Sequence, residues 1–194
     1  MSTIPQPRPS GAVPSPALLD LLARLEERGL ARHGHAVAEL SVRVCRALSL
    51  PGLLVERIEA AALLHDAGKV ELPQAVLDHP GPLSLMAWRL VREHPARSAR
   101  LVAQLPGLAS LAPWLRAHHE RWDGRGYPDR LAGEQIPLGA RIIHVCDAFD
   151  AMTSDRCYRD ALPPDAACAE IAAAAGSQFD PVVARALVAS MLDS

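Results

Sequence analysis

Histidines and aspartates concentrate in two short stretches of the chain. Residues 65–69 read HDAGK, and residues 118–128 read HHERWDGRGYP. Neighbouring imidazoles and carboxylates are unfavourable to bury unless a cation binds them. The recurrence of such groups in two distant stretches predicts one metal site that is assembled from separate segments of the chain.

The candidate ligands are histidines and aspartates that lie on or at the end of an expected helix: His33, His65, Asp66, His94, His118, His119 and Asp147. Successive helical residues point about 100° apart, so an adjacent pair such as His65 and Asp66 is expected to straddle two ions, with the carboxylate bridging them. We assign to one ion His33, His65, Asp66 and Asp147, and to the other Asp66, His94, His118 and His119.

The donor types narrow the choice of metal. Imidazole and carboxylate without thiolate favour two divalent ions of iron or manganese, with zinc and nickel as open alternatives. Two ions about 3.5–4 Å apart lower the pKa of a bridging water and hold a phosphate in line for displacement. The other histidines, His35, His79 and His144, are interpreted as structural, and His35 would point away from His33 on a helix.

Helical periodicity of apolar residues covers most of the chain. The expected helices span residues 17–28, 32–48, 54–65, 84–104, 113–119, 138–152, 164–175 and 181–192, with Gly29 as a stop and Ser84 as a cap. Pro95 lies inside one of these stretches and predicts either a kink or two helices there. Strand-like alternation is hard to find, so the predicted fold class is all-α.

Composition limits the domain organisation and the partners. Residues 1–16 include five prolines and predict a disordered or extended arm, followed by one domain over 17–194. The formal net charge of −2 argues against binding a nucleic-acid polymer. The four cysteines form no CxxC pair, and the sequence shows neither a signal peptide nor an apolar run of about 18 residues. We therefore expect a cytoplasmic protein with reduced thiols that does not enter the membrane.

The motifs resemble the HD-GYP subgroup of the HD superfamily of metal-dependent phosphohydrolases. HDAGK, HHERWDGRGYP and IPLGARIIHVCDAFDAMTSDRCYR carry the resemblance, which extends over about 32–187. It implies a single HD-type helical domain with a buried dinuclear metal site between helices. It also implies a cyclic di-GMP phosphodiesterase that uses a metal-bridging hydroxide and yields linear pGpG, with GMP as an open second product.

Further residue roles follow from the resemblance. Asp66 and Lys69 are expected in catalysis, with Lys69 touching a phosphate, and Arg156 and Arg159 match basic positions that hold the phosphates of the substrate. Tyr127 is expected either to stack on a guanine or to pack the loop. Asp150 is expected to support the Asp147 helix or a ligand histidine.

The resemblance leaves several questions open. Some relatives carry a glutamate that helps to hold a third metal at the position of Gly29, so we expect two metals here. The GYP loops of the family have been proposed to contact GGDEF-domain proteins. Regulation would come from a partner, from a homodimer formed through the first helix, or from metal supply. The main alternative to an enzyme is a catalytically inactive module that binds cyclic di-GMP or a protein, and mixed cyclic dinucleotides are alternative substrates.

Overall fold

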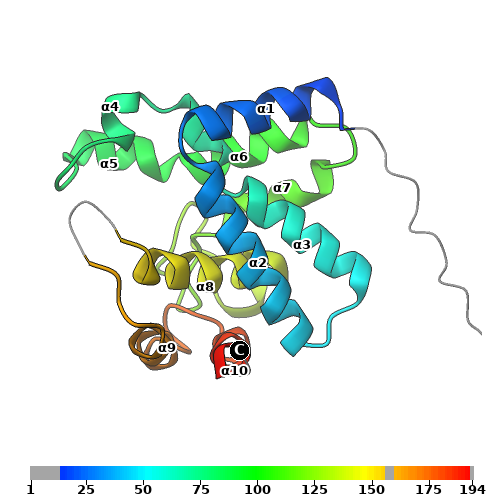
Figure 1. The fold of residues 1–194 in the computed structure, drawn as a ribbon, viewed down its shortest axis with the longest axis vertical. Helices are drawn as coiled ribbons and strands as arrows, with labels where there is room; N and C mark the ends of the chain where they lie inside the picture. Colours follow the sequence, from blue (N-terminus) through cyan, green and yellow to red (C-terminus); the bar gives the residue numbers. More distant parts are fainter. Residues whose placement is uncertain (1–13, 156–159, 193–194) are drawn as a thin grey trace, which may run out of the picture.

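Helix α2 (Ala31–Ala47) lies at the centre of the molecule. It contacts α3 (Gly52–Leu64), α8 (Leu138–Thr153) and α10 (Pro181–Leu192), as Figure 1 shows. Its buried residues include Val37 and Val44, which the apolar periodicity predicted for one side of this helix. The helices that surround α2 therefore share one core with it.

The structure is a computed structural model that describes residues 14–155 and 160–192. The remaining α-helices are α1 (Pro16–Glu27), α4 (Gln74–Leu77), α5 (Leu85–Arg92), α6 (His94–Ala103), α7 (Ala112–Ala117) and α9 (Pro164–Ala173). Short 3-10 helices are η1 (Ala67–Glu71), η2 (Ala109–Leu111) and η3 (Gly133–Gln135). Over these described ranges the only pairing of β type is an isolated bridge between Ala175 and Phe179, so the predicted all-α class is confirmed.

The helix boundaries follow local chemistry. Helix α1 begins at Pro16, which the sequence assigned to the arm, because Ser15 caps it and proline is tolerated in the first turn. Gly29 adopts a φ of +70° and ends α1, as predicted. The Ser84 hydroxyl accepts a hydrogen bond from the Ala87 amide at the start of α5, also as predicted.

Pro95 divides the predicted helix over 84–104 into α5 and α6, which resolves the two alternatives left open. Because proline has no amide hydrogen, it cannot bond to the carbonyl four residues earlier, which is that of Val91. The Val91 oxygen instead accepts a hydrogen bond from Nδ1 of His94 at 2.6 Å. The helix break therefore both separates the two helices and orients a candidate ligand.

The core extends from α2 to the metal-ligand candidates. Ile58 of α3, Ile142 of α8 and Leu187 of α10 are fully buried, and so are the histidines His65 and His118. Such burial of polar rings in an apolar core is unfavourable unless their nitrogen atoms find partners. Within the described residues, no helix is both long and apolar enough to cross a lipid bilayer.

Candidate metal centre

Three of the candidate histidines lie where a helix ends or begins. His65 caps the C-terminus of α3, His118 caps the C-terminus of α7, and His94 is the first residue of α6. In each, Nδ1 lies 2.6 Å from the backbone carbonyl oxygen three residues earlier. Since a carbonyl only accepts, Nδ1 of each ring carries a proton, and Nε2 is the nitrogen that is left for a metal ion.

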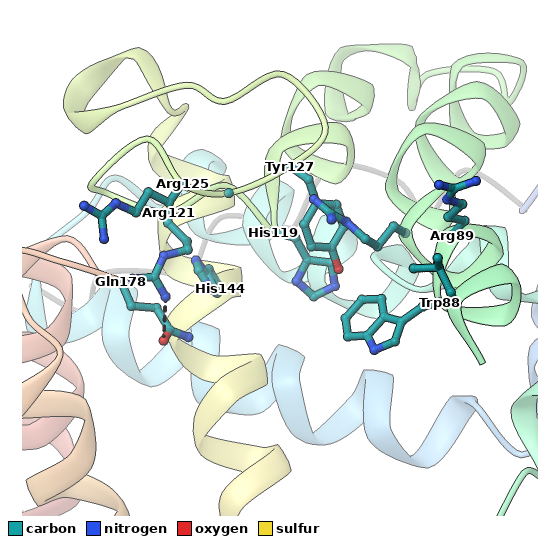
Figure 2. Close-up of a pocket in the computed structure, with 11 residues that line it drawn as sticks. Trp88, Arg89, His119, Arg121, Arg125, Tyr127, His144 and Gln178 are labelled. Carbon is teal, nitrogen blue, oxygen red and sulfur yellow. Dashed lines mark hydrogen bonds between the residues drawn. The ribbon is translucent and has the colours of Figure 1, made fainter. Parts of the chain in front are cut away.

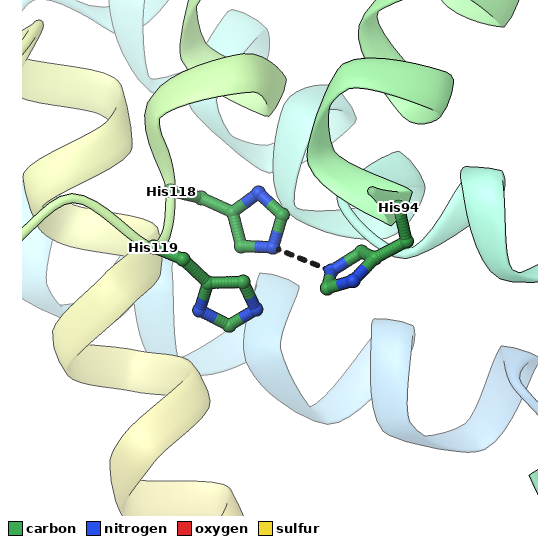
Figure 3. Close-up of side chains that lie close together, drawn as sticks. All are labelled: His94, His118 and His119. Atoms are coloured by element: carbon green, nitrogen blue, oxygen red, sulfur yellow. Dashed lines mark hydrogen bonds between the residues drawn. The ribbon is translucent and has the colours of Figure 1, made fainter. Parts of the chain in front are cut away.

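The first ligand set consists of His94, His118 and His119, and we name it the His94 cluster. One nitrogen of each ring lies within 4.8 Å of the others (Figure 3). Nε2 of His94 and Nε2 of His118 are 3.2 Å apart. Burial and the neighbouring imidazoles lower the pKa of His118 well below its ordinary value, and burial does the same for His119. The rings of His118 and His119 are therefore neutral, and their nitrogen lone pairs are available to a shared cation.

The second ligand set consists of His33, His65, Asp66 and Asp147, and we name it the His33 cluster. Single donor atoms of His33, His65 and Asp66 lie within 4.8 Å of one another, and Oδ1 of Asp147 is 3.1 Å from Nε2 of His33. Nδ1 of His33 donates to Oδ2 of Asp150 at 2.6 Å, so Asp150 orients this ring from behind. Burial alone would lower the pKa of His33, but hydrogen bonds with Asp147 and Asp150 raise it to about 10.

Asp66 lies between the two clusters. Its Oδ1 is 3.2 Å from Nε2 of His94, and its Oδ2 is 3.6 Å from Nε2 of His65. Lys69 donates to Oδ2 at 2.6 Å. Burial alone would raise the pKa of Asp66, but Lys69 and the surrounding imidazoles hold it well below the usual range. The carboxylate is therefore ionised and directs one oxygen toward each cluster, which is the arrangement of a bridging ligand.

The residues present fit divalent metal ions. Nε2 of His65 and Oδ1 of Asp66 are both buried without a hydrogen-bond partner, which is unfavourable unless a cation binds them. The two sets together supply imidazole nitrogen and carboxylate oxygen and contain no sulfur. Cys45, Cys146 and Cys168 are free thiols, as predicted, and belong to neither set. This donor set suits ions such as iron, manganese, zinc or nickel.

The chain changes from an α-helix to a 3-10 helix within the HDAGK motif. Helix α3 ends at Leu64, and the chain continues as η1, so Lys69 turns back toward Asp66. A side chain at Gly68 would collide with the His94 carbonyl and the Ser98 amide, so glycine permits η1 to pack directly on α6. The Ser98 hydroxyl donates to the His65 carbonyl at 2.7 Å and accepts from the Gly68 amide at 2.7 Å.

The loop after His119 is held by its own acidic residues. The Asp123 carboxylate accepts a hydrogen bond from the Arg125 amide at 3.1 Å. The Asp129 amide donates to the buried Glu120 carboxylate at 2.6 Å. The Tyr127–Pro128 peptide bond is cis, and the Tyr127 ring centroid lies 5.0 Å from that of His119. The loop thus carries Tyr127 to the edge of the His94 cluster.

A pocket of about 500 Å³ opens beside His119 (Figure 2). Helix α5 contributes Trp88 and Arg92 to one wall, and the loop contributes Tyr127. Sequence reasoning did not select Trp88 or Arg92, although their spacing of four residues places them on one helix face just before His94. His144 was predicted to be structural, yet it lines this pocket, and burial lowers its pKa to about 4.

The other predicted residues are placed as follows. His35 is exposed on α2, whereas His33 is partly buried and faces Asp147. His79 lies exposed in the loop before α5. Arg156 and Arg159 lie outside the described residues, so their predicted contacts with substrate stay predictions.

Comparison with known proteins places this geometry in a family. The sequence model of the HD domain matches residues 16–183. A cyclic di-GMP phosphodiesterase of Pseudomonas aeruginosa is 43% identical over 157 residues, which cover 80% of this chain and 38% of that protein. A cyclic di-GMP phosphodiesterase of Thermotoga maritima is 34% identical over 173 residues, covering 88% of this chain and 47% of that protein.

A third relative, the 3'3'-cGAMP-specific phosphodiesterase 3 of Vibrio cholerae, is 40% identical over 139 residues, covering 72% of this chain and 30% of that protein. The chain thus spans less than half the length of these curated relatives.

Solved structures agree on the fold. The HDG"Y"P protein Bd1817 from Bdellovibrio bacteriovorus superposes with a TM-score of 0.68 at 19% identity, covering 87% of this chain and 54% of that one. A cyclic GMP-AMP specific phosphodiesterase of V. cholerae superposes with a TM-score of 0.67 at 18% identity, covering 90% of this chain and 48% of that one. The superfamily predicted from the HDAGK motif is confirmed: the chain belongs to the HD domain family.

Proposed function

We propose that this chain hydrolyses a phosphodiester bond of cyclic di-GMP and releases linear pGpG. The observation that carries the proposal is the position of Asp66, whose two oxygens face the His94 cluster and the His33 cluster separately. Two adjacent cation sites are the arrangement used for in-line displacement at phosphorus. The similarity to cyclic di-GMP phosphodiesterases over most of the chain supports this substrate.

We assign two divalent ions to the two clusters, with iron or manganese as the first choice and zinc or nickel as alternatives. The proposed ligands are His33, His65, Asp66, His94, His118, His119 and Asp147. When bound, the ions supply a water of lowered pKa and neutralise negative charge on the phosphate. Gly29 offers no side-chain donor, so we propose no third ion.

The side chains of this protein divide the remaining tasks. The Asp66 carboxylate holds the two sites at a fixed separation. The Lys69 ammonium lies at the Asp66 oxygen that faces the His33 cluster, where it would neutralise charge on the bound phosphate. Arg156, Arg159 and Tyr127 are proposed as further substrate contacts. Asp150 and the three helix-end carbonyls hold the ligand imidazoles in one orientation and one tautomer.

The reaction adds the elements of water across one phosphodiester bond. The oxygen of water forms a bond to phosphorus, the bond from phosphorus to the ribose oxygen breaks, and the released ribose oxygen takes up a proton. A second cycle on pGpG would yield GMP, and we propose pGpG as the first product.

Two other functions are alternatives to this proposal. One is a mixed guanine–adenine cyclic dinucleotide as substrate, which the similarity to a 3'3'-cGAMP-specific phosphodiesterase favours. The other is an inactive module that binds cyclic di-GMP or a protein. Against the inactive module, every proposed ligand position holds a residue able to bind metal.

The wider setting of the protein stays predicted from its sequence. We propose that it works in the cytoplasm. The loop around Tyr127 is the proposed contact for a GGDEF-domain protein, and helix α1 is the proposed contact in a homodimer.

The decisive test incubates metal-replete protein with cyclic di-GMP and, separately, with 3'3'-cGAMP, and resolves the products by chromatography. The proposal expects pGpG from cyclic di-GMP and no product with the Asp66→Ala variant. Faster cleavage of 3'3'-cGAMP would reassign the substrate. Absence of cleavage of both nucleotides with iron and with manganese would favour the binding module.

A further inference from the structure

Helix α5 differs from the other long helices because none of its residues is buried. It nevertheless carries large apolar side chains, and Trp88 is 47% exposed while Met86 is 67% exposed. An exposed tryptophan on a helix outside the core has little reason to be there for folding. Trp88 instead lines the pocket beside His119, together with Arg89 and Arg92 of the same helix.

The lining of this pocket is positively charged. Arg89, Arg92, Arg121 and Arg125 face it, and none of the residues that line it is acidic. The whole chain, by contrast, has 20 basic and 22 acidic residues. The volume of about 500 Å³ lies within the range of ordinary small-molecule sites. This charge predicts an anionic ligand.

The arginines of the pocket are not equivalent. Arg121 donates to the Asp123 carboxylate at 2.7 Å and to the Gln178 side chain at 3.1 Å, so its charge is already compensated. Arg92 has no carboxylate partner among the residues that the structure describes. Its guanidinium carbon lies 4.4 Å from the centre of the Tyr127 ring, which holds it without neutralising it.

Tyr127 connects this guanidinium to the metal centre. Its ring lies 5.0 Å from the ring of His119, a member of the His94 cluster, and it contacts Arg92 as well. When one phosphodiester of a cyclic dinucleotide is held at the two clusters, Arg92 therefore lies one aromatic ring beyond it, on the side open to the second phosphate. Trp88 lies one helical turn before Arg92 on the same face of α5, and both residues line the pocket.

We infer that α5 forms a second binding site for the half of the cyclic dinucleotide that is not being cleaved. Arg92 binds its phosphate, and Trp88 stacks on one of its nucleobases. This inference rests on the proposed function, because it needs a substrate with two phosphates and two bases. The ligand class of the pocket is thus a purine nucleotide unit, and α5 selects cyclic dinucleotides over small diesters.

The test compares two substrates in the metal-replete full chain. One is cyclic di-GMP, and the other is bis(p-nitrophenyl) phosphate, a diester without a nucleobase or second phosphate. The measured quantity is the ratio of kcat/KM for cyclic di-GMP to kcat/KM for the small diester. The variants are Trp88→Ala and Arg92→Gln. Met86→Ala is the matched control, because Met86 is exposed on the same helix and does not line the pocket.

We expect the ratio of the two kcat/KM values to fall roughly 5- to 150-fold in Trp88→Ala, because one base–aromatic stack is lost. We expect a fall of roughly 10- to 150-fold for Arg92→Gln, as for the loss of a charged hydrogen bond. Met86→Ala should leave the ratio within about twofold. An unchanged ratio in both pocket variants, or an equal fall in Met86→Ala, would overturn the inference.

Binding of cyclic di-GMP can be measured independently of its hydrolysis, so it tests the α5 site apart from the proposed function. The dissociation constant of cyclic di-GMP is measured by calorimetry for the same four proteins. Weaker binding in Trp88→Ala and Arg92→Gln supports the α5 site, even if the wild-type protein does not cleave the nucleotide and the proposed function fails. Equal dissociation constants in all four proteins, or no binding to any, would overturn it.

Discussion

Asp66 of the His33 cluster also faces the His94 cluster, but the two clusters differ in their donor groups. The His94 cluster consists of three imidazoles, oriented at His94 and His118 by helix-end carbonyls. The His33 cluster adds a second carboxylate, Asp147, and a histidine whose ring is held by Asp150. One site thus offers a cation mainly imidazole nitrogen, and the other offers it carboxylate oxygen from two side chains as well. We therefore expect the two ions to be lost separately and to respond differently to pH.

Asp66→Ala should have the largest effect, because it removes a carboxylate whose two oxygens face the two clusters. Loss of a phosphate-neutralising metal centre is worth several kcal/mol, so kcat should fall about 10³-fold or more. Both bound ions should be lost or weakened. Hydrolysis of cyclic di-GMP and metal content are measured together, with Asp20→Ala on the exposed face of α1 as control. Retention of both ions in Asp66→Ala would mean that the clusters are independent.

Single histidine variants should remove one ion each. His118→Ala deletes a fully buried ring of the His94 cluster, and His33→Ala deletes a ring of the His33 cluster. Each variant should retain one ion per chain and lose hydrolysis, because neither site alone completes the pair. Elemental analysis of reconstituted protein measures the stoichiometry. Two ions in either variant would assign that histidine a structural role.

Asp150→Asn should weaken metal binding at the His33 cluster and leave metal binding at the His94 cluster unchanged. Asp150 is not itself a proposed ligand and acts by holding Nδ1 of His33 at 2.6 Å. Loss of such an orienting carboxylate typically weakens metal affinity about 10- to 100-fold. Metal titration should therefore show one weakened and one unchanged site, with Asp165→Asn on α9 as control. Equal weakening of both sites would contradict the division into two clusters.

Metal binding should release a proton at the His33 cluster and none from His118 or His119. Without metal, the pKa of His33 is raised to about 10, so this ring is protonated at pH 7. The pKa values of His118 and His119 lie well below the usual range, so these rings are already neutral. A cation must displace the His33 proton, and the affinity of this site should rise about tenfold per pH unit below that pKa.

Calorimetry in buffers of different ionisation enthalpy measures this proton, and His33→Ala should abolish the release. A release that persists in His33→Ala would assign the proton to another group. The stability of the metal-free fold should instead decrease as the pH rises. The positive charge on His33 stabilises the metal-free folded state fully below about pH 6.5, and this stabilisation is lost as the pH rises through about 10.

The sequence predicted the helices and the candidate ligands better than it predicted the pocket. Apolar periodicity located the helices, and the dense HDAGK and HHE motifs pointed to His65, Asp66 and His118. Periodicity could not show that carbonyls at helix breaks would orient these rings, because the breaks depend on tertiary packing. The pocket was missed for a similar reason. Trp88 and Arg92 form an ordinary amphipathic pattern, and only the fold shows that no core covers this helix.

The most direct test of the account is to locate the ions. Protein reconstituted anaerobically with manganese is crystallised, and anomalous diffraction maps the metal positions. We expect two peaks on either side of the Asp66 carboxylate, about 3.5–4 Å apart, one beside His118 and one beside His33. A single peak, or none, would contradict the proposal that Asp66 joins two metal sites.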